Sequence, residues 1–218
     1  MNNIRVAPSI LSGDFANMGA SVVKVCESGS DLVHMDVMDG VYVPNLTFGM
    51  PMVKAVKQYS NIPLDVHLMI VNPEKYIEQF IEAGADILTF HPEVCEETSK
   101  MLALIKDRGA KCGLVINPDK PIDLVLPYID KVDIIMFMGV YPGFSNQKFI
   151  VDVVDKIAPL KKIIDERGLN VEIEFDGGVS EDTAPLLIKE GVTILVSGSA
   201  FFKASNQKLF VDKLKGIN

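Results

Sequence analysis

Cysteine is scarce in this sequence of 218 residues. Its three cysteines, Cys26, Cys95 and Cys112, are an odd number, and no two of them form a Cys-x-x-Cys pair. A disulfide framework and a cysteine-based zinc site both need paired or closely spaced cysteines, so neither is expected. We therefore predict a protein of the reducing cytoplasm, in which the cysteines act as small hydrophobic side chains.

Long hydrophobic runs and an excess of positive charge are also missing. No uninterrupted apolar run approaches the roughly 20 residues of a membrane helix, and the N-terminus has no signal-peptide pattern. The formal net charge is -8. Nucleic acids and anionic membranes both favour clustered Lys and Arg, so neither is an expected partner. A small phosphorylated substrate is compatible with this charge, because backbone amides alone can bind phosphate.

The sequence lacks any sign of a domain boundary. It has no linker rich in Pro, Ser or Gly, no low-complexity run and no block of like charge. Because 48% of its residues are hydrophobic, the chain can bury one large core. We predict a single domain over residues 1–218.

Short apolar runs alternate along the chain with amphipathic stretches. The expected strands are Ile4 to Ile10, Leu32 to Val37, Leu64 to Met69, Ile87 to Phe90, Lys111 to Ile116, Val132 to Met138, Val171 to Phe175 and Ile194 to Val196. The expected helices are Ala16 to Cys26, Pro51 to Gln58, Pro73 to Ala83, Thr98 to Arg108, Pro121 to Tyr128, Lys148 to Arg167, Thr183 to Lys189 and Gln207 to Leu214. Eight strand-then-helix units indicate an α/β fold with a parallel sheet.

The parallel sheet can close into a (β/α)8 TIM barrel or stay open and doubly wound. An open sheet places its ligand site at a single crevice, whereas the polar residues here end many different strands. A barrel gathers the carboxyl ends of all its strands around one active site. The sequence therefore favours the (β/α)8 barrel.

The second expected strand and the residue after it carry an unusual row of side chains on one face. His34, Asp36 and Met38 share one face, since side chains alternate along a strand. Asp65, His67 and Met69 repeat the theme on the next strand. Burying the polar side chains of such a row in an apolar core would cost free energy. The competing interpretation is an edge strand whose polar face is solvated. All three histidines of the chain fall at the ends of neighbouring expected strands, which favours a functional site.

The polar residues at these strand ends include a set of metal-binding types. Two imidazoles and two carboxylates, from His34, Asp36, His67 and Asp176, suit one divalent ion, Zn, Fe(II), Mn or Co, better than an oxygen cage for Ca or Mg. His91 has no acidic neighbour on the same face of its strand, and a structural role is favoured for it. Met38, Met69 and Met138 are either core residues or an apolar lining that excludes water from the site.

Three glycine-containing turns follow the last three expected strands. They are Gly139 to Phe149, Gly177-Gly178 and Ser197 to Ala200. Backbone N–H groups in such turns bind phosphate, and barrels commonly place a phosphate beside their last strands. One such turn needs no ligand to explain it, but three in series predict a phosphate site.

These residues together resemble the ribulose-phosphate 3-epimerase family, whose members are (β/α)8 barrels. The resemblance covers nearly the full length. It rests on Ala7-Pro8-Ser9-Ile10-Leu11, His34-Met35-Asp36-Val37-Met38-Asp39-Gly40, Val43-Pro44-Asn45, Asp65-Val66-His67-Leu68-Met69, Tyr141-Pro142-Gly143-Phe144, Glu174-Phe175-Asp176-Gly177-Gly178 and Gly198-Ser199-Ala200.

The resemblance implies an isomerase that epimerises a 2-ketose phosphate at C3, D-ribulose 5-phosphate to D-xylulose 5-phosphate. It implies one divalent metal ion per subunit on His34, Asp36, His67 and Asp176, which stabilises an enediolate. It also implies that Asp36 and Asp176 are the catalytic acid/base pair, and that relatives form homo-oligomers, dimers or hexamers. The implied substrate-binding residues are Ser9, His67, Gly143, Phe144, Ser145, Asn146, Gly177, Gly178, Gly198 and Ser199, and Met38, Met69 and Met138 would line the enediolate.

The chain departs from the family pattern in and beside the phosphate turns. Gly139 stands where Thr or Ser is usual, Tyr141 where another polar residue is usual, Ser145-Asn146 where Gly-Gly is usual, and Phe175 where Val is usual. These changes leave D-allulose 6-phosphate 3-epimerase, which yields D-fructose 6-phosphate, as the alternative activity. A non-catalytic sugar-phosphate-binding barrel is the remote alternative.

Overall fold

The computed structural model describes residues 4–217, so that residues 1–3 and 218 of the predicted domain lie outside the described part. Eight parallel strands form one sheet in the order β1-β8-β7-β6-β5-β4-β3-β2. They are β1 (Arg5–Pro8), β2 (Val33–Met38), β3 (Leu64–Met69), β4 (Ile87–Phe90), β5 (Lys111–Ile116), β6 (Ile134–Met138), β7 (Glu172–Asp176) and β8 (Ile194–Ser197). The predicted (β/α)8 barrel is confirmed.

The ring of strands closes between β1 and β2. A single parallel bridge joins Ser9, just after β1, to His34 on β2. The closure therefore brings Ser9 to the edge of the expected site.

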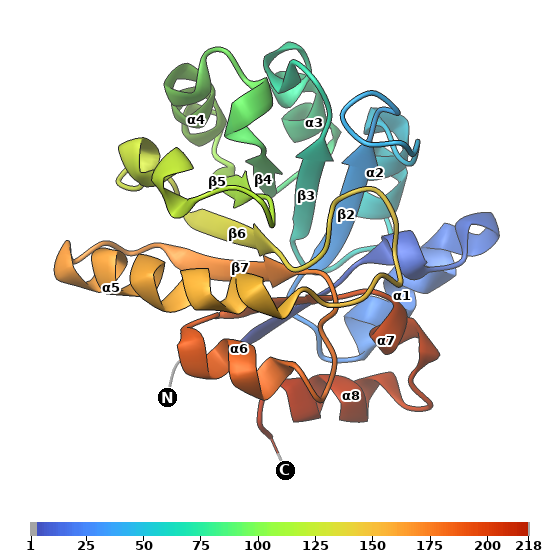
Figure 1. Ribbon diagram of the computed structural model, residues 1–218. Helices are drawn as coiled ribbons and strands as arrows, with labels where there is room; N and C mark the ends of the chain where they lie inside the picture. The colour runs from blue at the N-terminus through green and yellow to red at the C-terminus, as the bar shows by residue number, and fades with distance from the viewer. Residues whose placement is uncertain (1–3, 218) are drawn as a thin grey trace.

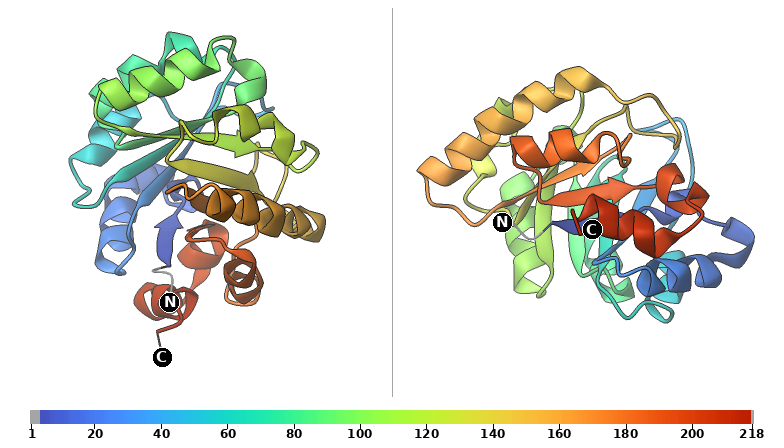
Figure 2. Two further views of the ribbon diagram at one scale, coloured as in Figure 1. Left: turned by 90° about the vertical axis from the view of Figure 1, so that its left-hand side faces the viewer. Right: turned by 90° about the horizontal axis from the view of Figure 1, so that it is seen from below.

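Helices surround the strands on the outside (Figures 1 and 2). They are α1 (Met18–Glu27), α2 (Met50–Lys57), α3 (Ile77–Ala83), α4 (Thr98–Asp107), α5 (Ile157–Glu166), α6 (Ala184–Glu190), α7 (Ser199–Lys203) and α8 (Gln207–Leu214). The main core lies between this helical layer and the outward faces of the strands, where Phe90, Phe137 and Phe175 are fully buried. No helix within residues 4–217 is long and apolar enough to cross a membrane.

Several expected element bounds are wrong in detail. The predicted helix over Pro121 to Tyr128 is instead two 3-10 turns, Ile122–Leu124 and Leu126–Tyr128. Pro127 explains the difference, because it has no N–H to donate to the carbonyl of Asp123 four residues earlier. The first expected strand ends early, since Ile10–Ser12 forms a 3-10 turn.

Other differences lie beside the phosphate turns. The predicted helix over Lys148 to Arg167 begins as a 3-10 segment, Val151–Lys156, before α5. The expected turn Ser197 to Ala200 contains the start of the short helix α7. The loop that follows β6 arches between β6 and α5 (Figure 1).

Candidate active site

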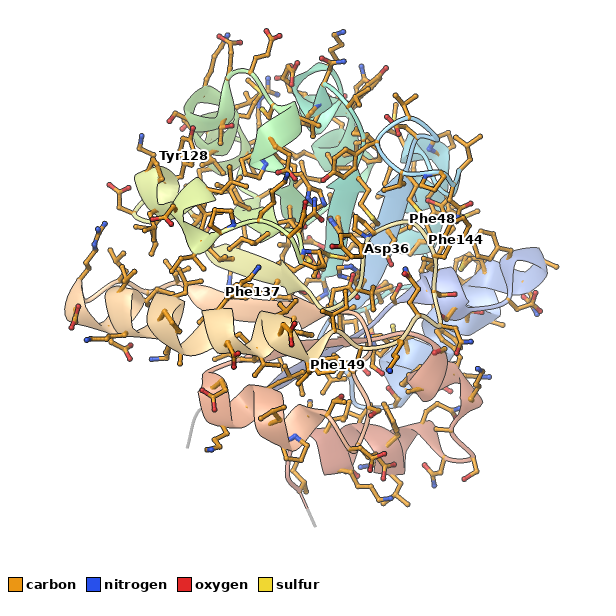
Figure 3. All side chains as sticks on the ribbon, viewed as in Figure 1. Asp36, Phe48, Tyr128, Phe137, Phe144 and Phe149 are labelled. Carbon is orange, nitrogen blue, oxygen red and sulfur yellow. The ribbon has the colours of Figure 1, made fainter. Side chains whose placement is uncertain are left out.

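The polar residues of β2 and β3 lie side by side because the two strands pair in register. Asp36 pairs with His67, and both are buried inside the barrel. Elsewhere in the ring, Asp176 of β7 pairs in register with Met138 of β6. Figure 3 shows Asp36 at the centre of the ring of strands. Parallel pairing thus gathers side chains that are far apart in sequence at one end of the barrel.

Four of these side chains point their ligand-type atoms at one another. His34 Nε2 lies 3.4 Å and His67 Nδ1 3.3 Å from Asp36 Oδ1. Asp176 Oδ2 lies 4.0 Å from each of the same two nitrogens. All four atoms are within 4.8 Å of one another. The structure therefore brings together the four residues that the sequence grouped as metal-binding types.

The two carboxylates of this cluster have very different proton affinities. Burial and the negative charge of Asp36 raise the pKa of Asp176 to about 7. Burial opposes the ionisation of Asp36 as well, but the charge of His34 and the contact with His67 hold its pKa well below the usual range. At neutral pH one carboxylate is therefore ionised and the other is poised to gain or lose a proton.

Neighbouring polar groups orient the cluster. Asp65 Oδ2 lies 2.6 Å from His34 Nδ1, so this carboxylate faces the ring nitrogen directed away from Asp36. Burial opposes the charged form of His34, but the charges of Asp65 and Asp36 raise its pKa well above the usual value. The Ser9 hydroxyl donates to Asp36 Oδ2 at 2.6 Å. These contacts orient the His34 ring and the Asp36 carboxylate.

Glu174 is a further buried carboxyl beside the cluster. Its Oε1 lies 3.8 Å from His34 Nδ1, and neither of its oxygens has a hydrogen-bond partner among the described residues. Burial and the charge of Asp65 raise the pKa of Glu174 well above the usual value, which favours its neutral form. Sequence reasoning gave no role to Asp65 or Glu174, although the period of two along each strand put them on the same face as the cluster.

A cavity opens above the cluster. Asp36 and Asp176 line it, together with Met38, Met69 and Met138. Among the expected substrate-binding residues, those that line the cavity are Ser9, Gly143, Phe144, Ser145, Asn146, Gly177, Gly178, Gly198 and Ser199. His67 is not among the lining residues, since it is buried in the cluster.

Glycines line this cavity at positions where a side chain would clash. Gly177 and Gly178 have φ of 111° and 72°, and an added Cβ would lie 2.7 Å from Val140 and 2.8 Å from Phe149 respectively. At Gly198 an added Cβ would lie 2.7 Å from Ser12 Oγ. Small residues here leave backbone N–H groups open to a ligand, as phosphate sites require.

Side-chain hydrogen bonds hold the loop after β6, in which Ser145-Asn146 stands where Gly-Gly is usual in the family. Asn146 adopts φ of 62°, a left-handed conformation that Asn tolerates, and its Oδ1 accepts from Lys203 Nζ at 3.2 Å. Gln147 Nε2 donates to the carbonyls of Tyr141 at 2.6 Å and Phe144 at 2.8 Å. The loop is therefore closed on itself and on α7 by hydrogen bonds.

Comparison with known proteins identifies the family. The model of the ribulose-phosphate 3 epimerase family matches residues 5–202. The ribulose-phosphate 3-epimerase of Bacillus subtilis (strain 168) is 46% identical over 214 residues, covering 98% of this chain and 99% of that protein. The chain belongs to the ribulose-phosphate 3-epimerase family. The ribulose-phosphate 3-epimerase of Escherichia coli (strain K12) is 41% identical over 216 residues, 99% of this chain and 96% of that protein.

Membership of this epimerase family makes the chain an isomerase. Solved structures of lower identity support the barrel alone. A mutant tryptophan synthase alpha-subunit from Pyrococcus furiosus superposes with a TM-score of 0.70 at 13% identity, over 100% of this chain and 99% of that chain. A thiamine phosphate pyrophosphorylase from the same organism gives a TM-score of 0.67 at 15% identity, over 99% and 96% of the two chains.

Two further residues beside this epimerase-family site were given no functional role by the sequence reasoning. Ser12 lines the cavity beside Gly198, and its buried hydroxyl has no hydrogen-bond partner among the described residues. His91, expected to be structural, contacts the cluster directly, since its Nε2 lies 2.9 Å from His67 Nε2. Ser12 follows the expected first strand in a 3-10 turn, so no strand period could assign its direction.

Proposed function

We propose that this chain interconverts D-ribulose 5-phosphate and D-xylulose 5-phosphate by inverting the configuration at C3. The observation that carries the proposal is the pair Asp36 and Asp176, two carboxylates of different proton affinity that both line the cavity. Inversion beside a carbonyl needs a base on one face of C3 and an acid on the other. A pair whose pKa values are pushed apart can supply both.

The donor set fits one divalent cation. Two imidazole nitrogens and two carboxylate oxygens suit Zn²⁺, Fe²⁺, Mn²⁺ or Co²⁺. His34 Nε2 is buried without a hydrogen-bond partner in residues 4–217, as expected of an atom that binds a cation. His34, Asp36, His67 and Asp176 are the residues that would hold it. When bound, the ion supplies Lewis-acid stabilisation of the negative charge that develops on the substrate oxygens.

The two aspartates divide the proton transfers. In one direction Asp36 in its ionised form removes the C3 proton from its face, and Asp176 in its protonated form delivers a proton to the opposite face. In the reverse direction the roles exchange. The hydrogen bond from Ser9 to Asp36 keeps that carboxylate in position for both directions. Each general acid or base contributes about 10²–10⁴-fold to such a rate.

The remainder of the cavity suits the rest of a ketose phosphate. The three methionine side chains lie where the enediolate would form and keep water from its reactive carbon. Beyond them, the turns at Gly177-Gly178 and Gly198-Ser199 offer backbone N–H groups for the phosphate. The small-molecule substrate is the proposed partner. A homo-oligomer, dimer or hexamer, and a cytoplasmic location stay predictions.

The decisive experiment is proton NMR in deuterium oxide on the metal-loaded protein with each of two sugars. We expect deuterium at C3 and accumulation of the epimer, faster with D-ribulose 5-phosphate than with D-allulose 6-phosphate. Faster turnover of the allulose phosphate would assign the sister activity and point to the Tyr141 to Asn146 loop as its cause. No exchange in either sugar would contradict the proposal.

Metal loading is expected to release a proton from Asp176 at pH 6 but not at pH 8. Its pKa of about 7 keeps the carboxyl mostly protonated at pH 6, and a cation favours the ionised form. At pH 8 the group is already mostly ionised, so its contribution nearly disappears. The proton that His34 must lose to bind the cation is counted at both pH values, because the pKa of His34 is raised well above the usual value. Isothermal titration calorimetry in two buffers of different ionisation enthalpy counts the protons at each pH. The Asp176→Asn variant is the control, and an equal count at both pH values in the wild type would contradict the assignment.

Ser12→Ala is expected to raise KM by roughly 10-fold and to leave kcat nearly unchanged. The Ser12 hydroxyl has no partner among the described residues and lies beside the glycine turns, so it is free to donate to the phosphate. One lost hydrogen bond to a charged group costs about 1.5–3 kcal/mol. Steady-state kinetics measures the split, with Ser30→Ala as control, because the Ser30 hydroxyl bonds Ser28 outside the cavity. An unchanged KM would exclude the role.

A further inference from the structure

The two histidines of the cluster have different outer partners. Each ring turns one nitrogen toward Asp36 and the other away from it. The outer nitrogen of His34, Nδ1, faces the carboxylate of Asp65 at 2.6 Å. The outer nitrogen of His67, Nε2, instead faces the imidazole of His91 at 2.9 Å. His67 therefore depends on a third histidine where a carboxylate or a backbone carbonyl usually stands.

The contact between His67 and His91 restricts where protons can reside. Two nitrogens at 2.9 Å are joined by one proton, so one ring must donate and the other must accept. If His67 Nδ1 offers its lone pair to a cation, the proton of that neutral ring is on Nε2, and His91 Nε2 must accept it. The proton of a neutral His91 is then on Nδ1.

The surroundings of His91 favour that arrangement. The ring is fully buried, and burial in a low-dielectric interior favours the neutral form of an imidazole. Its Nδ1 has no hydrogen-bond partner in residues 4–217, and the nearest carboxylate oxygen, Glu93 Oε1, lies 3.8 Å away. A negative charge at that distance favours the tautomer with its proton on Nδ1.

Two further side chains hold Glu93 in place. The Tyr42 hydroxyl donates to Glu93 Oε1 at 3.0 Å, and Asn117 Nδ2 donates to the same oxygen at 2.8 Å. The Tyr42 ring also packs on His91, with 4.7 Å between the ring centroids. A continuous chain of polar contacts thus runs from Glu93, whose side chain is partly exposed, through His91 to His67.

We propose that His91 is a positioning residue that accepts the Nε2 proton of His67 and so presents His67 Nδ1 to the cation. Glu93, fixed by Tyr42 and Asn117, sets the tautomer of His91. The inference rests on the proposed metal site and adds a layer to it: the tautomer of one ligand is set by a buried neutral histidine rather than by a charged group.

Two substitutions separate hydrogen bonding from packing. His91→Phe keeps an aromatic ring between Tyr42 and His67 but removes the acceptor. His91→Gln supplies a carbonyl oxygen near the position of Nε2. Outer partners of ligand histidines are worth about 10–100-fold in metal affinity, so His91→Phe is expected to weaken Zn²⁺ binding by that factor and His91→Gln by a few-fold at most. Competition of metal-free protein with a chromophoric chelator measures the affinities, and thermal unfolding checks that each variant folds.

The tautomers are read directly by long-range ¹H–¹⁵N NMR of the Zn²⁺-loaded protein labelled on histidine. The chain has only three histidines, so three imidazoles appear, and the His91 signals are identified by their loss in the variant spectra. We expect His91 to carry its proton on Nδ1 and His67 on Nε2. A proton on His91 Nε2, or equal affinities for wild type and His91→Phe, would overturn the inference. Failure of the wild type to bind Zn²⁺ would instead overturn the metal site itself, and this inference with it.

Discussion

Replacing Asp176 with asparagine is expected to lower kcat for epimerisation by about 10²–10⁴-fold. In one of the two epimers, the C3 proton should still exchange with solvent. Asparagine keeps the shape of the side chain but cannot act as a general acid or base. Asp36 can still remove the C3 proton from its own face and return it there. Deuterium would therefore enter one epimer without formation of the other.

Asp36→Asn is the reciprocal test. We expect it to stop epimerisation as well and to allow exchange only in the opposite epimer, since Asp176 then acts alone. Proton NMR in deuterium oxide distinguishes the two variants when each is given each pentulose phosphate. Metal content must be measured in parallel, because both aspartates belong to the proposed ligand set. Full turnover by Asp36→Asn with metal bound would contradict the assignment.

The barrel and the centre of the site could be predicted from local rules. Alternation along a strand puts His34 and Asp36 on one face, and His67 on the same face of the next strand. Parallel strands present their carboxyl ends at one end of a barrel, so Asp176 joins them. The register that pairs Asp36 with His67 follows from the barrel and needs no loop to be known.

What lies beyond the strand ends could not be predicted in the same way. His91 follows the last residue of β4, and its direction depends on the 3-10 turn Pro92–Val94. Its contact with His67 also depends on side-chain torsions that the sequence pattern does not encode. Ser12 is a comparable case, because it lies in a turn after β1.

Two departures from the family pattern are explained by one another. The family resemblance leads us to expect Thr or Ser at position 139 and Val at position 175, where this chain has Gly and Phe. The Phe175 side chain is fully buried in the main core between strands and helices, and it contacts Phe149, with 5.7 Å between ring centroids. A Cβ on Gly139 would lie only 2.3 Å from Phe175 Cε1 and 2.8 Å from its Cζ. The larger ring at 175 therefore leaves no room for a side chain at 139, and the carbonyl oxygen of Gly177, 2.4 Å from the same added Cβ, restricts the position further.

A double-mutant cycle tests this pairing. Gly139→Ser alone is expected to lower the free energy of unfolding by about 3 kcal/mol, because a buried side chain is forced against the Phe175 ring. Phe175→Val alone leaves a cavity and is expected to cost about 2–3 kcal/mol. The double variant should cost about 1–2 kcal/mol less than the sum, since removing the ring makes room for the serine. Part of the cost remains, because the carbonyl oxygen of Gly177 lies 2.4 Å from the same added Cβ.

Urea unfolding at equilibrium measures each free energy, and Gly113→Ser provides the matched control. An added Cβ at Gly113, on β5, meets Thr89 and Ile134 and not Phe175. Combined with Phe175→Val it should therefore be additive within about 0.5 kcal/mol. Additivity in the Gly139 cycle as well would mean that glycine at 139 is required by the Gly177 backbone alone. Coupling in the Gly139 cycle only would mean that the phenylalanine before Asp176 and the glycine that begins the phosphate loop form one structural unit.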